Sequence, residues 1–226
     1  TVPADGNILF HDGDENIINL IEMGCWSNTY KLGSEENIKL SIEEGIIHLE
    51  GQRFDLSELP MHGQHNLNNA VMAMYASFLH GVDPQKAFLA LKNSNGVKRR
   101  FETVFHNNEK TVIDDFAHHP TAISNTVEAA INHFAPKKVM GIVELASNTM
   151  SQGHHGVELY DSASGLEQVY WLNLSSKKNQ DFEYDSINLL LEDLKKDIDS
   201  IDVILIMSNK DSKKISEPII DIIKSK

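Results

Sequence analysis

The stretch Val112-Ile113-Asp114-Asp115-Phe116-Ala117-His118-His119-Pro120-Thr121 decides the fold. Two carboxylates close an apolar run, two histidines follow, and Pro120 suits the first turn of a helix. The residues from there to Phe134 keep apolar side chains at helical spacing. A strand, an acidic turn and a helix therefore succeed one another, which is the order typical of a parallel α/β sheet.

The adjacent aspartates permit two interpretations. Ligands bind beyond the carboxyl ends of the strands in an open α/β sheet, so Asp114 and Asp115 are candidates for a binding site. Aspartates at a strand end are also common turn formers. The pattern alone leaves both interpretations open.

Downstream of this stretch, strand-like and helix-like segments continue to alternate. Expected strands lie near residues 101–106, 110–114, 138–143, 168–172 and 202–207, and expected helices near 120–134, 154–160, 186–198 and 213–225. The run Val203-Ile204-Leu205-Ile206-Met207 is apolar on both faces, as a strand covered by helices on each side must be. The sequence therefore predicts a Rossmann-like, mostly parallel sheet.

Upstream, the pattern is different. A short strand near residues 7–10 precedes an amphipathic helix through Ile21, and four alternating runs then indicate an antiparallel meander. These runs cover residues 27–31, 38–42, 46–49 and 52–56, and two helices follow at about 66–80 and 84–91. Polar residues with a glycine at 92–96 mark a boundary, so we expect one domain over 1–95 and another over 96–226.

Composition narrows the class of protein. The 226 residues are 41% hydrophobic, which can supply a core, and the net charge of −13 argues against general binding of nucleic acid or anionic membranes. The tight basic cluster Lys98-Arg99-Arg100 is either a solvated turn or a site for a polyanionic nucleotide. The single cysteine, Cys25, and the lack of a long apolar run favour a cytoplasmic protein.

Three further segments resemble, together with the opening stretch and in the same order, the Mur ligases, which are ATP-dependent amide-forming enzymes of peptidoglycan synthesis. They are Gly63–Ala70 (GQHNLNNA), Gly96–Glu102 (GVKRRFE) and Ser147–Met150 (SNTM). The murein peptide branch, which joins UDP-N-acetylmuramate to the recycled tripeptide L-alanyl-γ-D-glutamyl-meso-diaminopimelate, resembles the chain most. A UDP-N-acetylmuramate:L-alanine ligase and a non-catalytic relative that binds peptidoglycan peptides are the alternatives.

This resemblance implies an architecture and a set of ligands. Residues 1–95 resemble the second half of a central ATPase domain, a mixed sheet plus helices, and residues 96–226 resemble the C-terminal domain. The sequence contains no phosphate loop of the form G-x-x-x-x-G-K-[ST]. The groups that hold the ATP phosphates and Mg²⁺ would then lie upstream of Thr1, and the chain alone is expected to be inactive. The implied partners are ATP, Mg²⁺, UDP-N-acetylmuramate and the tripeptide.

The resemblance also implies which residues contact ATP. His65, Asn66 and Asn69 begin a helix and correspond to family residues near the adenine, although asparagine there could simply cap the helix. Arg100 corresponds to a hinge arginine that reaches the nucleotide, a task that suits a planar cation. Asp115 corresponds to an acid that binds the ribose hydroxyls, and its neighbour is expected to be structural.

Peptide contacts are implied for a second group of residues. They are His118, His119, Ser147, Asn148 and Thr149. A zinc site at the two histidines is disfavoured because consecutive side chains diverge and no third ligand lies at a suitable spacing. We therefore expect no metal site within this chain.

The chain departs from the family pattern at two places. Ala146 stands where the family carries the arginine of a Glu-Pro-Arg sequence, a residue well suited to a peptide carboxylate. The stretch Ser208–Lys214 (SNKDSKK) replaces a glycine-rich turn. These changes are compatible with a diverged ligase of altered peptide specificity or with a relative that no longer catalyses.

Overall fold

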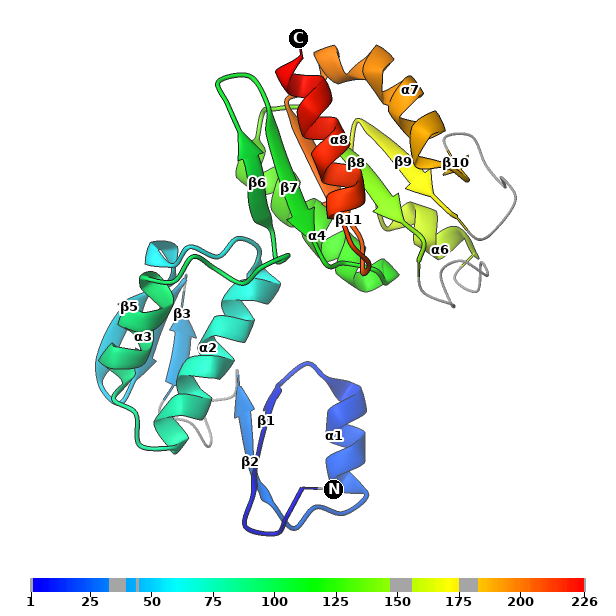
Figure 1. Ribbon diagram of the computed structural model, residues 1–226. Helices are drawn as coiled ribbons and strands as arrows, with labels where there is room; N and C mark the ends of the chain where they lie inside the picture. The colour runs from blue at the N-terminus through cyan, green and yellow to red at the C-terminus, as the bar shows by residue number, and fades with distance from the viewer. Residues whose placement is uncertain (1, 33–39, 44, 147–155, 175–182, 226) are drawn as a thin grey trace. The chain divides into compact units, whose positions relative to one another are not determined.

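A computed structural model describes residues 2–32, 40–43, 45–146, 156–174 and 183–225 (Figure 1). The chain forms two compact units. Unit 1 comprises Thr1–Pro60 and Asn66–Asn95, and unit 2 comprises Met61–His65 and Gly96–Lys226. Within the described ranges, each helix is too short or too polar to cross a membrane.

Unit 1 begins with a strand, a helix and a second strand. These are β1 (Asn7–His11), α1 (Glu15–Glu22) and β2 (Asn28–Leu32), and the two strands pair in parallel. The prediction that residues 27–31 belong to the antiparallel meander is therefore wrong. Because α1 carries the chain back along the sheet, the second strand runs in the same direction as the first.

The rest of unit 1 confirms the meander in its later strands. It contains β3 (Leu40–Glu43), β4 (Ile46–Leu49), β5 (Gln52–Asp55), η1 (Leu56–Glu58), α2 (Gln64–Leu79) and α3 (Pro84–Lys92). The three strands pair antiparallel in sequence order. Asp83 caps α3 by accepting a 3.2 Å hydrogen bond from the Lys86 amide, and Phe88 packs on Phe54 with ring centroids 5.1 Å apart.

Unit 2 contains a six-stranded sheet in the order β10-β9-β8-β11-β7-β6. Its strands are β6 (Glu102–His106), β7 (Thr111–Asp115), β8 (Val139–Glu144), β9 (Gln168–Leu172), β10 (Glu183–Tyr184) and β11 (Val203–Met207). Only β6 runs antiparallel to its neighbour within the described sheet, so the mostly parallel sheet is confirmed. The two residues of β10 are too few to give a sequence pattern.

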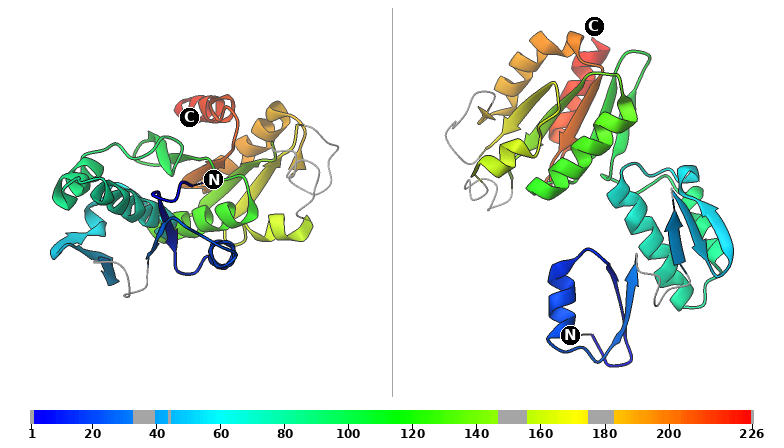
Figure 2. Two further views of the ribbon diagram at one scale, coloured as in Figure 1. Left: turned by 90° about the horizontal axis from the view of Figure 1, so that it is seen from below. Right: turned by 180° about the vertical axis from the view of Figure 1, so that it is seen from behind.

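Helices cover both faces of this sheet (Figures 1 and 2). The helices α4 (Pro120–Phe134) and α6 (Gly156–Asp161) lie on one face, and α7 (Ile187–Asp197), η2 (Ile198–Ser200) and α8 (Lys213–Lys224) lie on the other. Each face has its own apolar core, and all five residues of β11 are buried between the two. This placement explains why that strand is apolar on both faces.

A lysine closes the edge at which the parallel strands begin. The Lys110 ammonium, just before β7, donates hydrogen bonds to the carbonyl oxygens of Ile198 at 2.8 Å, of Asp199 at 3.2 Å, and of Ile201. The carbonyls at a helix end have no partner within the helix, so a cation there is favourable. Lys110 thus fastens β7 to the turn that leads into β11.

Candidate functional site

Several buried polar residues of unit 2 lie at the opposite edge, where the parallel strands end. There β7 ends in Asp114 and Asp115, β8 ends in Glu144, and Ser208 follows β11. This carboxyl edge is where ligands bind in open α/β sheets. The sequence prediction for the two aspartates therefore places them at the correct edge.

Asp115 is occupied by contacts within unit 2. Its side chain is 1% exposed, and it accepts hydrogen bonds from the Phe101 amide at 2.8 Å, the Ala117 amide at 2.8 Å and the Thr126 hydroxyl at 3.2 Å. These bonds fasten the chain before β6 and the first turns of α4 to the end of β7. A contact between Asp115 and an ATP ribose stays a prediction, and it would have to share the oxygens that hold these three donors.

Asp114 joins three segments. It is 5% exposed, it accepts a 2.6 Å hydrogen bond from the Ser212 hydroxyl, and its Oδ2 lies 3.3 Å from Nε of Arg99. Burial raises the pKa of the Asp114 carboxyl, while the Ser212 hydroxyl and the Arg99 charge oppose that rise. The contacts connect β7 to the residues before β6 and to the start of α8.

Two neighbouring arginines occupy different environments in the hinge loop, which we define as residues 97–101. The Arg99 side chain is 27% exposed and its guanidinium carbon lies 5.0 Å from the centroid of the Phe116 ring. Arg100 is exposed, and its guanidinium carbon lies 5.9 Å from the same ring. Arg100 is therefore accessible to a ligand, whereas its neighbour is built into the structure.

The three residues proposed to lie near the adenine begin α2 but differ in exposure. Asn66 is 7% exposed and belongs to unit 1, as does Asn69, which is exposed. His65 belongs to unit 2 and is half-buried. Burial lowers the pKa of His65, the Asp115 charge raises it, and the charge of Arg100 lowers it further. Contact of all three residues with ATP stays a prediction.

The histidine pair after β7 is anchored to its own turn. The His118 ring packs edge-on against Phe116 at 5.1 Å, and its Nδ1 lies 2.8 Å from the carbonyl oxygen of Phe116. His119 is the exposed N-cap residue of α4. The other proposed peptide contacts, Ser147, Asn148 and Thr149, lie outside the described residues. Among the described side chains, no group of three or more His, Cys, Asp or Glu is arranged to hold a metal ion.

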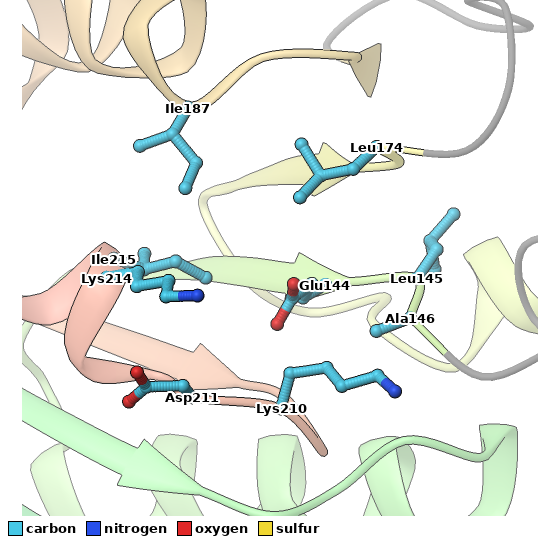
Figure 3. A pocket seen from close by; sticks show the side chains of 9 residues that line it. All are labelled: Glu144, Leu145, Ala146, Leu174, Ile187, Lys210, Asp211, Lys214 and Ile215. Carbon is cyan, nitrogen blue, oxygen red and sulfur yellow. The ribbon is translucent and has the colours of Figure 1, made fainter.

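A cavity of about 400 Å³, which could not be predicted from the sequence pattern, opens at the carboxyl edge (Figure 3). Its lining combines both signs of charge with apolar walls. The residues are Glu144, Leu145, Ala146, Leu174, Ile187, Lys210, Asp211, Lys214 and Ile215. In the view of Figure 3 the Glu144 carboxylate lies between the Lys214 ammonium on the left and the Lys210 ammonium on the right. The sequence could have indicated this cavity by one feature only: its charged residues lie at or shortly after the ends of β8 and β11, which end at this edge.

Ser208 fixes the start of the loop that carries the two cavity lysines. Its hydroxyl donates to the Glu144 carboxylate and accepts a 2.9 Å hydrogen bond from the Lys210 amide. Its amide donates to the Asp115 carbonyl at 3.0 Å, and its own carbonyl accepts from Nη2 of Arg99 at 2.5 Å. The cavity wall and the hinge loop are therefore joined through one residue.

Comparison with known proteins assigns the family. Residues 99–209, which contain this edge almost entirely, match the family model described as Mur ligase, glutamate ligase domain. The chain belongs to the Mur ligase family.

Two curated Mur ligases are similar over long stretches. Both are named UDP-N-acetylmuramate–L-alanyl-γ-D-glutamyl-meso-2,6-diaminoheptandioate ligase. The Haemophilus influenzae protein is 30% identical across 100% of this chain and 54% of its own length, and the Escherichia coli protein is 32% identical across 76% and 39%. The chain thus spans about half the length of these relatives or less.

A solved Mur ligase structure agrees with the fold. The murein peptide ligase of Psychrobacter arcticus superposes with a TM-score of 0.71 at 25% identity, over 97% of this chain and 52% of that one. Its match extends over both units, so the parallel βαβ segment of unit 1 and the six-stranded sheet of unit 2 belong to the same family architecture.

Proposed function

We propose that the whole protein carrying this chain joins UDP-N-acetylmuramate to the tripeptide L-alanyl-γ-D-glutamyl-meso-diaminopimelate at the expense of ATP, with Mg²⁺. The names of the two curated relatives support this reaction. Residues 1–95 would be the later part of the ATP-binding domain and residues 96–226 the domain that presents the peptide. The site of action would be the cytoplasm.

The lining of the cavity at the carboxyl edge is the observation that favours the tripeptide as the substrate. The distal end of meso-diaminopimelate bears an ammonium and a carboxylate on a short methylene chain. Lys210 and Lys214 offer cations for the carboxylate, and Glu144 and Asp211 offer anions for the ammonium. The side chain of L-alanine is a methyl group without charge, so an L-alanine ligase would have no substrate group for the charged residues of this cavity to bind.

The same cavity accounts for the missing arginine. Ala146 lies on the cavity wall, and the Lys210 side chain extends toward it from the loop after β11 (Figure 3). A cation therefore remains available at this place although it comes from a different strand end. Leu174, Ile187 and Ile215 supply apolar surface for the methylene chain.

The exposed Arg100 fits the nucleotide part of the reaction. When bound, ATP supplies the phosphoryl group that activates the lactyl carboxylate. A planar guanidinium that stays charged can hold phosphate oxygens in a bidentate manner, and Arg100 is the exposed arginine of the hinge loop. Asn66 and Asn69 would approach the adenine, since amide groups both donate and accept hydrogen bonds. The cavity would hold the peptide so that its amine is oriented for attack.

Ligation assays with the whole protein test the proposal. The protein would receive ATP, Mg²⁺ and UDP-N-acetylmuramate with either L-alanine or the tripeptide, and ADP and product mass would be measured. Product with the tripeptide alone is expected. Product with L-alanine alone would replace the proposal by the L-alanine ligase, and peptide binding without any product would indicate the non-catalytic relative.

A pair of lysine variants tests the cavity itself. Lys210→Ala should raise KM for the tripeptide roughly 10- to 100-fold, because a hydrogen bond to a charged group is worth about 1.5–3 kcal/mol. Lys213→Ala is the matched control, since Lys213 is an exposed lysine three residues further along, at the start of α8, that does not line the cavity. Equal KM values for both variants would remove the cavity from the peptide site.

A further inference from the structure

The hinge loop carries two adjacent arginines, of which Arg99 is partly buried and Arg100 is exposed. Arg99 has φ +57° and Phe101 has φ +56°, a left-handed conformation that costs a non-glycine residue about 1–2 kcal/mol. Such strain persists only where surrounding contacts impose it. The contacts at both positions are therefore the reason for the shape of the loop.

Arg99 is held on its backbone and along its side chain. Its amide donates to the Glu102 carboxylate at 2.7 Å, and its carbonyl accepts from the Phe116 amide at 2.8 Å. Its guanidinium lies over the Phe116 ring, pairs with Asp114 and donates to the Ser208 carbonyl at 2.5 Å. One side chain thus meets the turn after β7 and the loop after β11.

Phe101 is held in turn by the buried carboxylate. Its amide donates to Asp115, and its ring is 5% exposed. Arg100 stands between the two fixed residues, with its amide donating to the Val97 carbonyl at 3.1 Å and its side chain exposed. Because both neighbours are fixed, the backbone of Arg100 has little freedom to turn inward.

We propose that Arg99 is a positioning residue, which holds the hinge loop so that Arg100 faces the nucleotide and which fixes the start of the cavity loop through Ser208. Arg100 as the nucleotide contact rests on the proposed function. The arrangement of the loop rests only on the contacts of unit 2. A guanidinium fits this place because its planar face lies over the Phe116 ring while its edge is directed toward Asp114 and the Ser208 carbonyl.

Amide hydrogen exchange in the chain as it stands tests the positioning. Arg99→Met should speed exchange of the Arg100 and Phe101 amides at least about tenfold relative to core amides of β11, and Arg99→Lys should do so to a smaller extent. Lys110→Met is the matched control, since Lys110 also joins β7 to the β11 region but at the opposite edge of the sheet. It destabilises unit 2 as a whole and should speed exchange of the β11 amides at least as much as that of the hinge-loop amides, so the ratio should not rise. Equal ratios in Arg99→Met and Lys110→Met would overturn the proposal.

Kinetics of the whole protein test the consequence for the reaction. Arg99→Met should raise KM for ATP about tenfold more than Lys110→Met does, because a small misplacement of a binding group is costly. Arg99→Lys should recover part of the loss. An unchanged KM for ATP in an active ligase would refute the link to Arg100. A wild-type protein without ligation would instead refute the proposed function, and the exchange ratios would still decide the positioning role.

Discussion

Replacing Asp115 by alanine is expected to remove a principal internal connection of unit 2. The carboxylate is 1% exposed and accepts two backbone amides at 2.8 Å and one hydroxyl at 3.2 Å. The hydroxyl of Thr126 can rotate to another acceptor, whereas the amides of Phe101 and Ala117 cannot. Each buried donor left without a partner costs about 1–3 kcal/mol, so we expect a loss of roughly 4 kcal/mol in the free energy of unfolding.

Urea unfolding followed by tryptophan fluorescence measures this loss. Trp171 is 5% exposed on β9 and reports on unit 2, while Trp26 in unit 1 is 87% exposed and should change little. With a slope of about 2 kcal/mol per molar urea, the midpoint should fall by about 2 M. Asp115→Asn keeps the shape and one acceptor oxygen, so its loss should be about half as large.

The opposite result would be informative. If Asp115→Ala lost less than about 1 kcal/mol, the amides of Phe101 and Ala117 would have to find other partners, and the carboxylate would not be a structural anchor. Asp115 would then be free to bind a ribose at little cost to the fold. A loss near 4 kcal/mol means instead that a ribose contact must add to the existing hydrogen bonds.

Further perturbations address other parts of unit 2. Lys110→Met should cost about 1–3 kcal/mol in urea unfolding because three backbone carbonyls lose a charged donor. Gly63→Ala should cost about 3 kcal/mol, since Gly63 has φ +84° and an added Cβ would lie 2.8 Å from Cβ of Ala129; an unchanged melting temperature would contradict this. Burial and the charge of His133 lower the pKa of His62 below its usual 6.5, so folding stability should fall as the pH falls through 6.5. His62→Phe should flatten that dependence in unfolding curves recorded from pH 7.5 to 5.5, and a slope equal to the wild type would refute the assignment.

Most helices and strands of unit 2 could be predicted from the sequence because their apolar residues recur with the spacing of a helix or form a short continuous run. The prediction of a helix at 120–134 matches α4, and the apolar run at 202–207 matches β11 to within one residue. Strand pairing was less predictable. The run at 27–31 alternates like a meander strand, but its direction depends on the path of α1, which periodicity alone does not reveal.

The candidate site was predicted in part. The acidic turn was placed at the correct edge of the sheet, but the sequence could not show that both aspartates are buried and bonded. Nor could it distinguish Arg99 from Arg100 by physical reasoning, because the positive φ of a non-glycine residue comes from tertiary contacts. The cavity was missed because its residues come from four separate segments that meet only in the folded sheet.

The two departures from the family pattern meet in one cavity, and this bears on how they arose. Ala146 removes a cation from the wall after β8, and Lys210 adds one from the loop after β11. A glycine-rich turn could not carry such a side chain, so the loss of glycine and the gain of lysine are one physical change. If the two substitutions were unrelated, the lost arginine and the gained lysine would not be expected to line the same cavity. The proposed tripeptide site would therefore need no arginine at position 146, because Lys210 would supply the cation at this cavity.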